Sequence, residues 1–244
     1  MIRGNMFRLF TYFLLKKFNF TFLYLFILPL TSFIGESFAE NINDKIPWVQ
    51  WKKAPEIQLE YRHVNDGDLI EVKAQIKLTS SLSAFLLFLL DTDNVPNWLD
   101  NAKESQVLKT VENNTHIFTT EFYGFWPISS REMIIRSHQW QNDDLSVEIH
   151  IENAFDLAKK KHTILVDVMS ANWLITPTIS KEGEKTLAIE YTFIVDAKGN
   201  VPTWLVNSMT LKSTWQTLKN IKKQLPQSKW QSSTLAHINE ISNR

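Results

Sequence analysis

Near its C-terminal end the chain contains the segment PTWLVNSMTLKSTWQTLKNIKKQLP, residues 202–226. Pro202 and Pro226 mark the ends of a predicted helix, because proline is tolerated at a helix start and interrupts a helix interior. The helix is expected to run from about Thr203 to Gln224, and about 22 residues reach roughly 33 Å. Its apolar stripe is predicted to consist of Trp204, Ser208, Leu211, Trp215, Leu218 and Leu225. A helix of this length can lie across the open face of a curved sheet.

The segments before this helix show the period-two alternation of β-strands. Strands are expected over Ile57–Val64 and Leu69–Leu78, joined at Asn65-Asp66-Gly67, which is a hairpin turn signal. The second strand places Ile70, Val72, Ala74, Ile76 and Leu78 on one face. Further strands are expected at residues 106–111, 115–125, 131–140, 145–151, 162–175 and 185–195. One apolar and one polar face are typical of an antiparallel sheet.

Three short helices complete the predicted elements. The first spans Asp44–Lys53 and carries Trp48 and Trp51. The second is capped by Ser81 and runs to about Leu90, and the third surrounds Trp98. Together these elements predict an α+β domain of the helix-grip type. In this fold a curved antiparallel sheet of seven or eight strands wraps around the long C-terminal helix.

Four stretches of the chain carry a family resemblance. They are WKKAPEIQLEYR at 51–62; FLLD at 88–91 with Trp98; WPISSREM at 126–133; and WLITP at 173–177, continuing through Tyr191 and Asp196 to KGNVPTWLVN at 198–207. In order and spacing they resemble the START family, the steroidogenic-acute-regulatory-protein-related lipid transfer domains, and particularly its bacterial exported members. Glu132 and Met133 stand where the family motif has Asp and Phe.

The resemblance covers roughly residues 45–225, and the last stretch is its most specific part. It implies a START/Bet v1-like helix-grip fold whose sheet and last helix enclose a tunnel for one apolar ligand. In relatives this ligand is a sterol, phospholipid, ceramide or carotenoid. We therefore predict a monomer that binds a lipid or other apolar small molecule and makes transient membrane contact. It needs no cofactor.

The predicted ligand-binding residues are inward apolar positions of the late strands and the closing helix. They are Met169, Trp173, Tyr191, Phe193, Trp204, Leu211 and Trp215, with Met209 as a further wall candidate. Plain core packing is the competing interpretation for each of them. Some family members place an acid and an arginine inside the tunnel, which would point to Glu121 and Arg136. Arg136 lies five residues after Arg131 and so faces the opposite side of a strand, and we do not assign this pair.

Residues 1–39 have the pattern of an export signal. Four basic residues up to Lys17 precede an apolar stretch at 18–30, and Ser37-Phe38-Ala39 supplies the small residues of a cleavage site. Cleavage is expected after Ala39. The alternative is an uncleaved segment that anchors the protein to the inner membrane. Either way the domain, expected at 40–230 with a C-terminal tail at 231–244, would act in the periplasm.

Composition excludes several function classes. The chain has 26 basic and 26 acidic residues, so no strong positive field is available to bind nucleic acid. It has no cysteine and no His-Glu-x-x-His or other metal spacing, which leaves no predicted metal site and no cysteine nucleophile. The run Lys159-Lys160-Lys161 is interpreted as a solvated turn, with docking to anionic headgroups as the alternative. We expect no catalytic residues and no enzyme. The competing hypothesis is a cyclase, aromatase or hydrolase on the same fold that acts on an apolar substrate.

Overall fold

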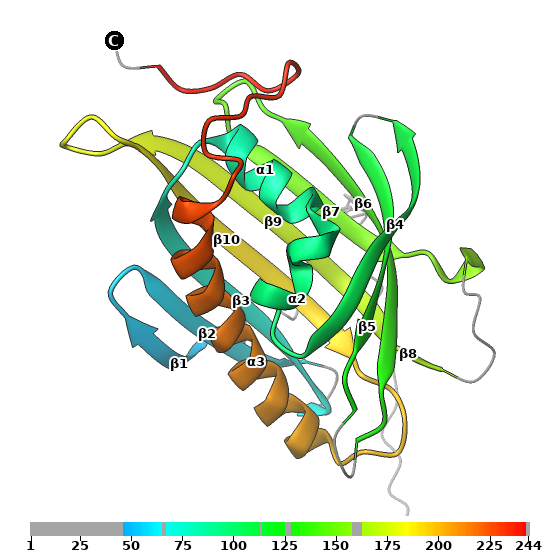
Figure 1. Ribbon diagram of the computed structural model, residues 1–244. Coiled ribbons are helices and arrows are strands. Elements are labelled where there is room, and N and C mark those ends of the chain that lie inside the picture. The colour runs from blue at the N-terminus through cyan, green and yellow to red at the C-terminus, as the bar shows by residue number, and fades with distance from the viewer. Residues whose placement is uncertain (1–45, 65–66, 113, 125–127, 158–162, 243–244) are drawn as a thin grey trace, which may run out of the picture. The chain divides into compact units, whose positions relative to one another are not determined.

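The computed structural model describes residues 46–64, 67–112, 114–124, 128–157 and 163–242. Its strands are β1 (Val49–Ala54), β2 (Ile57–Val64), β3 (Leu69–Thr79), β4 (Ala102–Glu112), β5 (Thr115–Phe122), β6 (Arg131–Gln141), β7 (Val147–Asn153), β8 (Ile164–Leu165), β9 (Asp167–Ile179) and β10 (Lys185–Asp196). Its α-helices are α1 (Leu82–Leu90), α2 (Val95–Trp98) and α3 (Thr203–Gln224). Figure 1 shows all three helices on the same side of one curved sheet.

The sheet has the order β1-β2-β3-β10-β9-β7-β6-β5-β4, and every neighbouring pair in this order is antiparallel. The short strand β8 adds a parallel pairing to β6. The predicted α+β helix-grip fold is confirmed, with α3 lying across the sheet (Figure 1). The described residues form ten strands rather than seven or eight, because β1 was not predicted and the single strand expected at 162–175 is divided into β8 and β9.

The alternating pattern of β3 produces a buried face and a wet face. Its inward side chains are at most 6% exposed: Ile70, Val72, Ala74, Ile76 and Leu78. On the outer face Arg62 pairs with Glu71, and Lys73 pairs with Glu60 at 3.0 Å. The hairpin of β2 and β3 therefore forms as the alternation predicts.

Helix α1 is buried on most sides, and side chains accept from the free amides at its N-terminal end. The Ser81 hydroxyl accepts from the Ala84 amide at 3.1 Å, as the sequence predicts for an N-cap. The Glu240 carboxylate accepts from the Leu82 and Ser83 amides at 3.3 and 2.8 Å. A carboxylate at a helix N-terminus is stabilised by the helix dipole.

Residues 231–242, expected as part of a tail after the domain, pack against α1 and the sheet. Ile238 is 8% exposed and belongs to the main core. The Leu235 amide donates to the Ser83 hydroxyl, and Asn239 exchanges two hydrogen bonds with the side chain of Gln141. The C-terminal segment thus holds α1 over the sheet (Figure 1).

The predicted helix over Asp44–Lys53 is wrong, because residues 49–54 form the edge strand β1. The backbone turns at Glu56, where φ is 63°, and pairs β1 with β2. The register shifts between Gln50 and Lys52, and this bulge lets Trp51 reach the helix side of the sheet. There its ring lies 6.3 Å from that of Trp215. A spacing of three between Trp48 and Trp51 suits a helix, but the backbone of residues 49–54 pairs with β2 instead.

Helix α3 has the predicted bounds and buries most of the predicted stripe, including Leu225 directly after its last residue. Leu211, Trp215, Leu218 and Ile221 are buried, whereas Trp204 is 71% exposed. Trp204 lies two turns before Leu211 on the same side of the helix, and nothing in the described chain covers it there. The apolar stripe therefore begins at Leu211.

Several sequence predictions fall outside the described residues. These are the signal segment 1–39 with cleavage after Ala39, the turn residues Asn65 and Asp66, the motif residues Trp126 and Pro127, and the run Lys159–Lys161. None of the helices in the described part of the chain combines the length and hydrophobicity needed to cross a membrane.

Candidate ligand cavity

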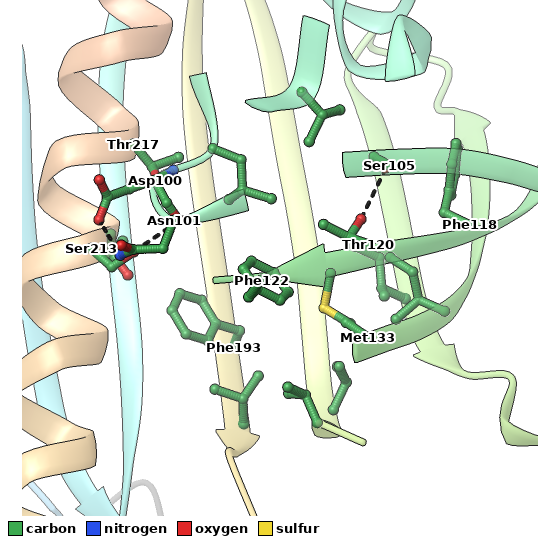
Figure 2. A pocket seen from close by; sticks show the side chains of 18 of the residues that line it. Asp100, Asn101, Ser105, Phe118, Thr120, Phe122, Met133, Phe193, Ser213 and Thr217 are labelled. Atoms are coloured by element: carbon green, nitrogen blue, oxygen red, sulfur yellow. Dashed lines mark hydrogen bonds between the residues drawn. The ribbon is translucent and has the colours of Figure 1, made fainter. Parts of the chain in front are cut away.

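A cavity of about 390 Å³ lies between the helices and the inner face of the sheet. This volume is within the range of pockets that hold one small molecule. The sheet supplies one side of the wall, mainly from β5, β6, β9 and β10, and the helices α1, α2 and α3 and the loops beside them supply much of the rest. Figure 2 shows Phe122, Met133 and Phe193 facing this space between α3 and the sheet.

Strand β6 shows how the sequence builds the wall. Its alternate residues Arg131, Met133, Ile135, Ser137 and Gln139 line the cavity. The side chains between them face outward, because successive side chains of a strand point to opposite faces. Met133 and Ile135 contribute apolar surface, and the polar groups lie toward both ends of the strand.

Three of the predicted residues lie on the cavity wall. The Trp173 and Tyr191 rings stack with centroids 4.2 Å apart, and the Tyr191 and Phe193 rings stack at 4.8 Å. Burial raises the pKa of the Tyr191 phenol far above its ordinary value, so this group stays neutral. The three rings form a continuous aromatic surface across β9 and β10.

The other four predicted residues do not line the cavity. Leu211 and Trp215 are buried in the core that α3 forms with β1, β2 and β3, and Trp204 is exposed. Met169 is 51% exposed, although in a regular strand its position four before Trp173 would put both side chains on the same face. A bulge in the β9–β10 pairing leaves Met169 without a partner, so that Val168 faces inward instead. The extra residue reverses the strand parity on which the prediction rested.

Apart from Met209, the cavity side of α3 was missed, because half of its residues are polar. It consists of Val206, Met209, Thr210, Ser213, Thr214, Thr217, Leu218 and Ile221, which includes the wall candidate Met209. The hydroxyl residues at 210, 213, 214 and 217 follow helical spacing. That second stripe was the available signal, and it lies beside the apolar stripe rather than on it.

Polar groups gather at two sides of the cavity (Figure 2). Beside α3, the Asp100 amide donates to the Thr217 hydroxyl at 3.0 Å, and the Ser213 hydroxyl donates to the Asp100 carbonyl. On the opposite side, the hydroxyls of Ser105 and Thr120 lie 2.9 Å apart. Most of the wall between these two groups is apolar.

Arg131 is 8% exposed, and each of its three guanidinium nitrogens donates to a backbone carbonyl. Nε donates to Ala197 O at 2.7 Å, Nη1 to Ser129 O at 2.6 Å and Nη2 to Lys198 O at 2.9 Å. Burial lowers the pKa of Arg131 from its ordinary value. Arg131 therefore fixes the loop between β10 and α3 at one end of the cavity.

The same loop is held from its other side by Lys198. Its Nζ lies 2.8 Å from Asp196 Oδ2 and 3.1 Å from Asp167 Oδ2, and these hydrogen bonds raise the pKa of Lys198. Burial opposes ionisation of Asp196, but its hydrogen bonds with Lys198 leave its pKa lowered. Gly199 has a φ of 83°, and a Cβ there would lie 3.2 Å from Ile164 Cδ1. A glycine suits this position for both reasons.

The charged pair that some START members carry is absent from the described cavity wall. Arg136 donates to Glu152 Oε1 at 2.6 Å on the outer face, as its strand parity predicts. Glu121 also lies on the outer face, where its carboxylate is 3.2 Å from Lys103 Nζ. Within the described ranges, no group of three or more His, Cys, Asp or Glu side chains is placed to hold a metal ion.

Solved structures share this architecture. The STAR-related lipid transfer protein fragment from Xanthomonas axonopodis superposes with a TM-score of 0.60 at 21% identity, over 73% of this chain and 98% of that one. Human StAR-related lipid transfer protein 5 gives 0.60 at 14% identity, over 74% and 86%. Human STARD10 gives 0.58 at 19% identity, over 75% and 78%. The fold is the START fold.

Sequence comparison adds one distant relative. The chain is 22% identical over 164 residues to an uncharacterized protein of Pseudomonas aeruginosa, covering 66% of this chain and 73% of that protein. No family model matches the chain. Within the START fold, the motif Gly199–Asn207 forms the loop and first turn that lead into α3. The sequence stretch with the most specific resemblance therefore adjoins the cavity wall at Ala197 and Val206.

Proposed function

We propose that this protein binds one lipid or similar apolar molecule in its internal cavity and transfers it. We also propose that the protein acts outside the cytoplasm. The observation that supports ligand binding most is the cavity of about 390 Å³, walled mainly by aliphatic and aromatic side chains. The START fold supports it independently, because its sheet and last helix enclose this space. The proposal includes no chemical step and no catalytic residue.

The hydrophobic effect is large enough to hold such a ligand. Burial contributes about 0.8 kcal/mol per methylene group, so a chain of about twelve methylenes contributes roughly 10 kcal/mol. Association opposes this with the lost translational and rotational freedom of the ligand. With an association cost of about 4 kcal/mol, roughly 6 kcal/mol remains, which corresponds to a Kd of some tens of micromolar without any ionic contact.

The place of action rests on the N-terminal sequence. The export signal expected over residues 1–39 supports a periplasmic location, with the domain either released after Ala39 or anchored to the inner membrane. Fractionation of cells that express the full chain tests this. Recovery in the cytoplasmic fraction would contradict the proposed location.

Transient membrane contact is proposed at one end of the cavity. Tyr123 lines the cavity and is 59% exposed, and Trp204 is 71% exposed just before the lining residue Val206. Exposed Trp and Tyr rings favour the membrane interface. Trp204→Ala should reduce co-sedimentation with phosphatidylglycerol vesicles severalfold while leaving ligand affinity unchanged. Val107→Ala, at an exposed site on β4, is the control, and equal sedimentation of both variants would contradict the contact.

Binding itself is tested with Nile red, an uncharged apolar dye whose fluorescence rises in apolar surroundings. The proposed function predicts saturable binding of one dye per chain. A fluorescence signal that does not saturate, or that needs unfolded protein, would contradict it.

A further inference from the structure

Gln139 places an amide group without a partner at the cavity wall. The residue is 7% exposed, and its Nε2 has no hydrogen-bond partner among the described residues. Its backbone amide is engaged, since it donates to Asn114 O at 2.9 Å. A buried N–H group costs free energy unless an acceptor reaches it. The cavity is therefore bordered by a residue whose side-chain donor the described protein does not use.

Trp98 supplies a second donor of the same kind. It lines the cavity and is 7% exposed, and its ring packs 5.6 Å from that of Phe88. Its Nε1 also lacks a partner in the described chain. An indole nitrogen can only donate. Both groups thus belong to residues that border the cavity, and each requires an acceptor oxygen or nitrogen.

The ionisable side chains of the cavity wall, in contrast, already have hydrogen-bond partners or lie at the edge of the cavity. Apart from two tyrosines, the ionisable side chains among the described lining residues are Asp100, His116 and Arg131. All three guanidinium nitrogens of Arg131 donate to carbonyls. Asp100 accepts from the exposed Asn101 at 2.7 Å, and His116 Nδ1 lies 3.2 Å from the Thr110 hydroxyl. No described lysine or glutamate lines the cavity, and none is available to pair with a charged headgroup.

The wall between the polar groups would penalise a charge. Phe122, Met133 and Phe193 face the middle of the space (Figure 2). A charge in such surroundings loses its hydration and gains no partner. From the unused donors and the committed charges we infer that the ligand is an uncharged lipid with a hydrogen-bond acceptor, such as an ester, ketone or hydroxyl oxygen, placed beside Gln139.

The positions of Gln139 and Arg131 on β6 also set the orientation of the ligand in the cavity. Gln139 lies eight residues beyond Arg131 along β6, a distance of roughly 27 Å at about 3.4 Å per residue. Arg131 contacts the loop that leads into α3, near the exposed Trp204. The acceptor therefore lies at the far end, and the apolar chain extends toward the end with Arg131.

This inference rests on the proposed function, and three probes that share a twelve-carbon chain distinguish a failure of the inference from a failure of the function. Methyl dodecanoate is neutral with an acceptor, dodecanoate at pH 8 is charged, and dodecane lacks an acceptor. The affinity of each probe is measured by its displacement of Nile red from the purified domain. We expect the ester to bind at least about tenfold more tightly than the carboxylate, because burial of an unpaired charge is unfavourable. We expect it to bind roughly fivefold more tightly than the alkane, because it gains one hydrogen bond.

Gln139→Leu isolates the acceptor contact. In this variant the ester should lose its roughly fivefold advantage over dodecane, while the alkane binds as before. Gln58→Leu, on the outer face of β2, is the matched control and should leave both affinities unchanged. Tighter binding of dodecanoate, or an unchanged preference for the ester in Gln139→Leu, would overturn the inference and leave the proposed function intact. Failure of Nile red and all three probes to bind would instead overturn the proposed function.

Discussion

A Ser137→Trp variant should lose most of its affinity for apolar ligands while remaining folded. Ser137 lies on the cavity face of β6 between Ile135 and Gln139, so the indole ring enters space that is already open. If the ring displaces about four methylenes of ligand, the loss is about 3 kcal/mol, or roughly a hundredfold in Kd. The melting temperature should change little, because the ring fills a void rather than an occupied core. Nile red titration and thermal unfolding measure the two quantities.

The matched control is His138→Trp, which adds the same ring one residue further along β6. His138 is exposed on the outer face, where its Nδ1 lies 2.8 Å from the Thr115 hydroxyl. This variant should bind like the parent protein. Met133→Trp provides a second cavity variant if Ser137→Trp does not fold. Full affinity in a folded cavity variant would show that the ligand binds elsewhere.

Arg131→Met should lower the free energy of unfolding by about 3–5 kcal/mol. The substitution keeps the length of the side chain but removes the donors to Ala197, Ser129 and Lys198. Those carbonyls would lose their hydrogen-bond donor, and water would not readily replace it, because the site of the Arg131 side chain is only 8% exposed. The loop into α3 loses its attachment to β6 at the same time, so ligand exchange should also become faster. Urea unfolding and the dissociation rate of Nile red check both effects.

The control for Arg131→Met is Arg136→Met, which changes the arginine on the opposite face of β6. Its pair with Glu152 has side chains that are 37% and 52% exposed. Pairs of this kind contribute about 0–1 kcal/mol, because solvent screens them. Equal stability losses in Arg131→Met and Arg136→Met would contradict the structural role assigned to Arg131.

The elements with a clear period were predictable from the sequence. Helix α3 begins and ends where Pro202 and Pro226 indicate, and β2, β3 and α1 have nearly the expected bounds. Strand β1 was not predictable, because its formation depends on pairing with β2 rather than on its own pattern. Edge strands gain much of their stability from such tertiary context.

The cavity was predictable only in part, for two geometric reasons. Trp173, Tyr191 and Phe193 were found because regular alternation continues through β9 and β10 at those positions. Met169 was misplaced because one bulge reverses the parity of the strand. On α3 the apolar stripe indicated the core, whereas the cavity lies against the neighbouring stripe of hydroxyl residues. A sequence pattern shows which side of a helix is buried, but not whether protein or ligand covers it.

The donor at Gln139 was outside the reach of sequence reasoning. A glutamine in a strand is ordinarily exposed, and only the structure shows that this one is 7% exposed with its Nε2 unpaired. The same holds for Arg131, whose three acceptors include carbonyls 66 and 67 residues further along the chain.

Mass spectrometry of the protein purified from the periplasm in detergent-free buffer tests the proposed carrier role most directly. We expect about one uncharged lipid per chain, released on denaturation and absent from Ser137→Trp prepared in parallel. Recovery of an empty protein that also fails to bind Nile red or to take up labelled lipid from vesicles would contradict the proposed function.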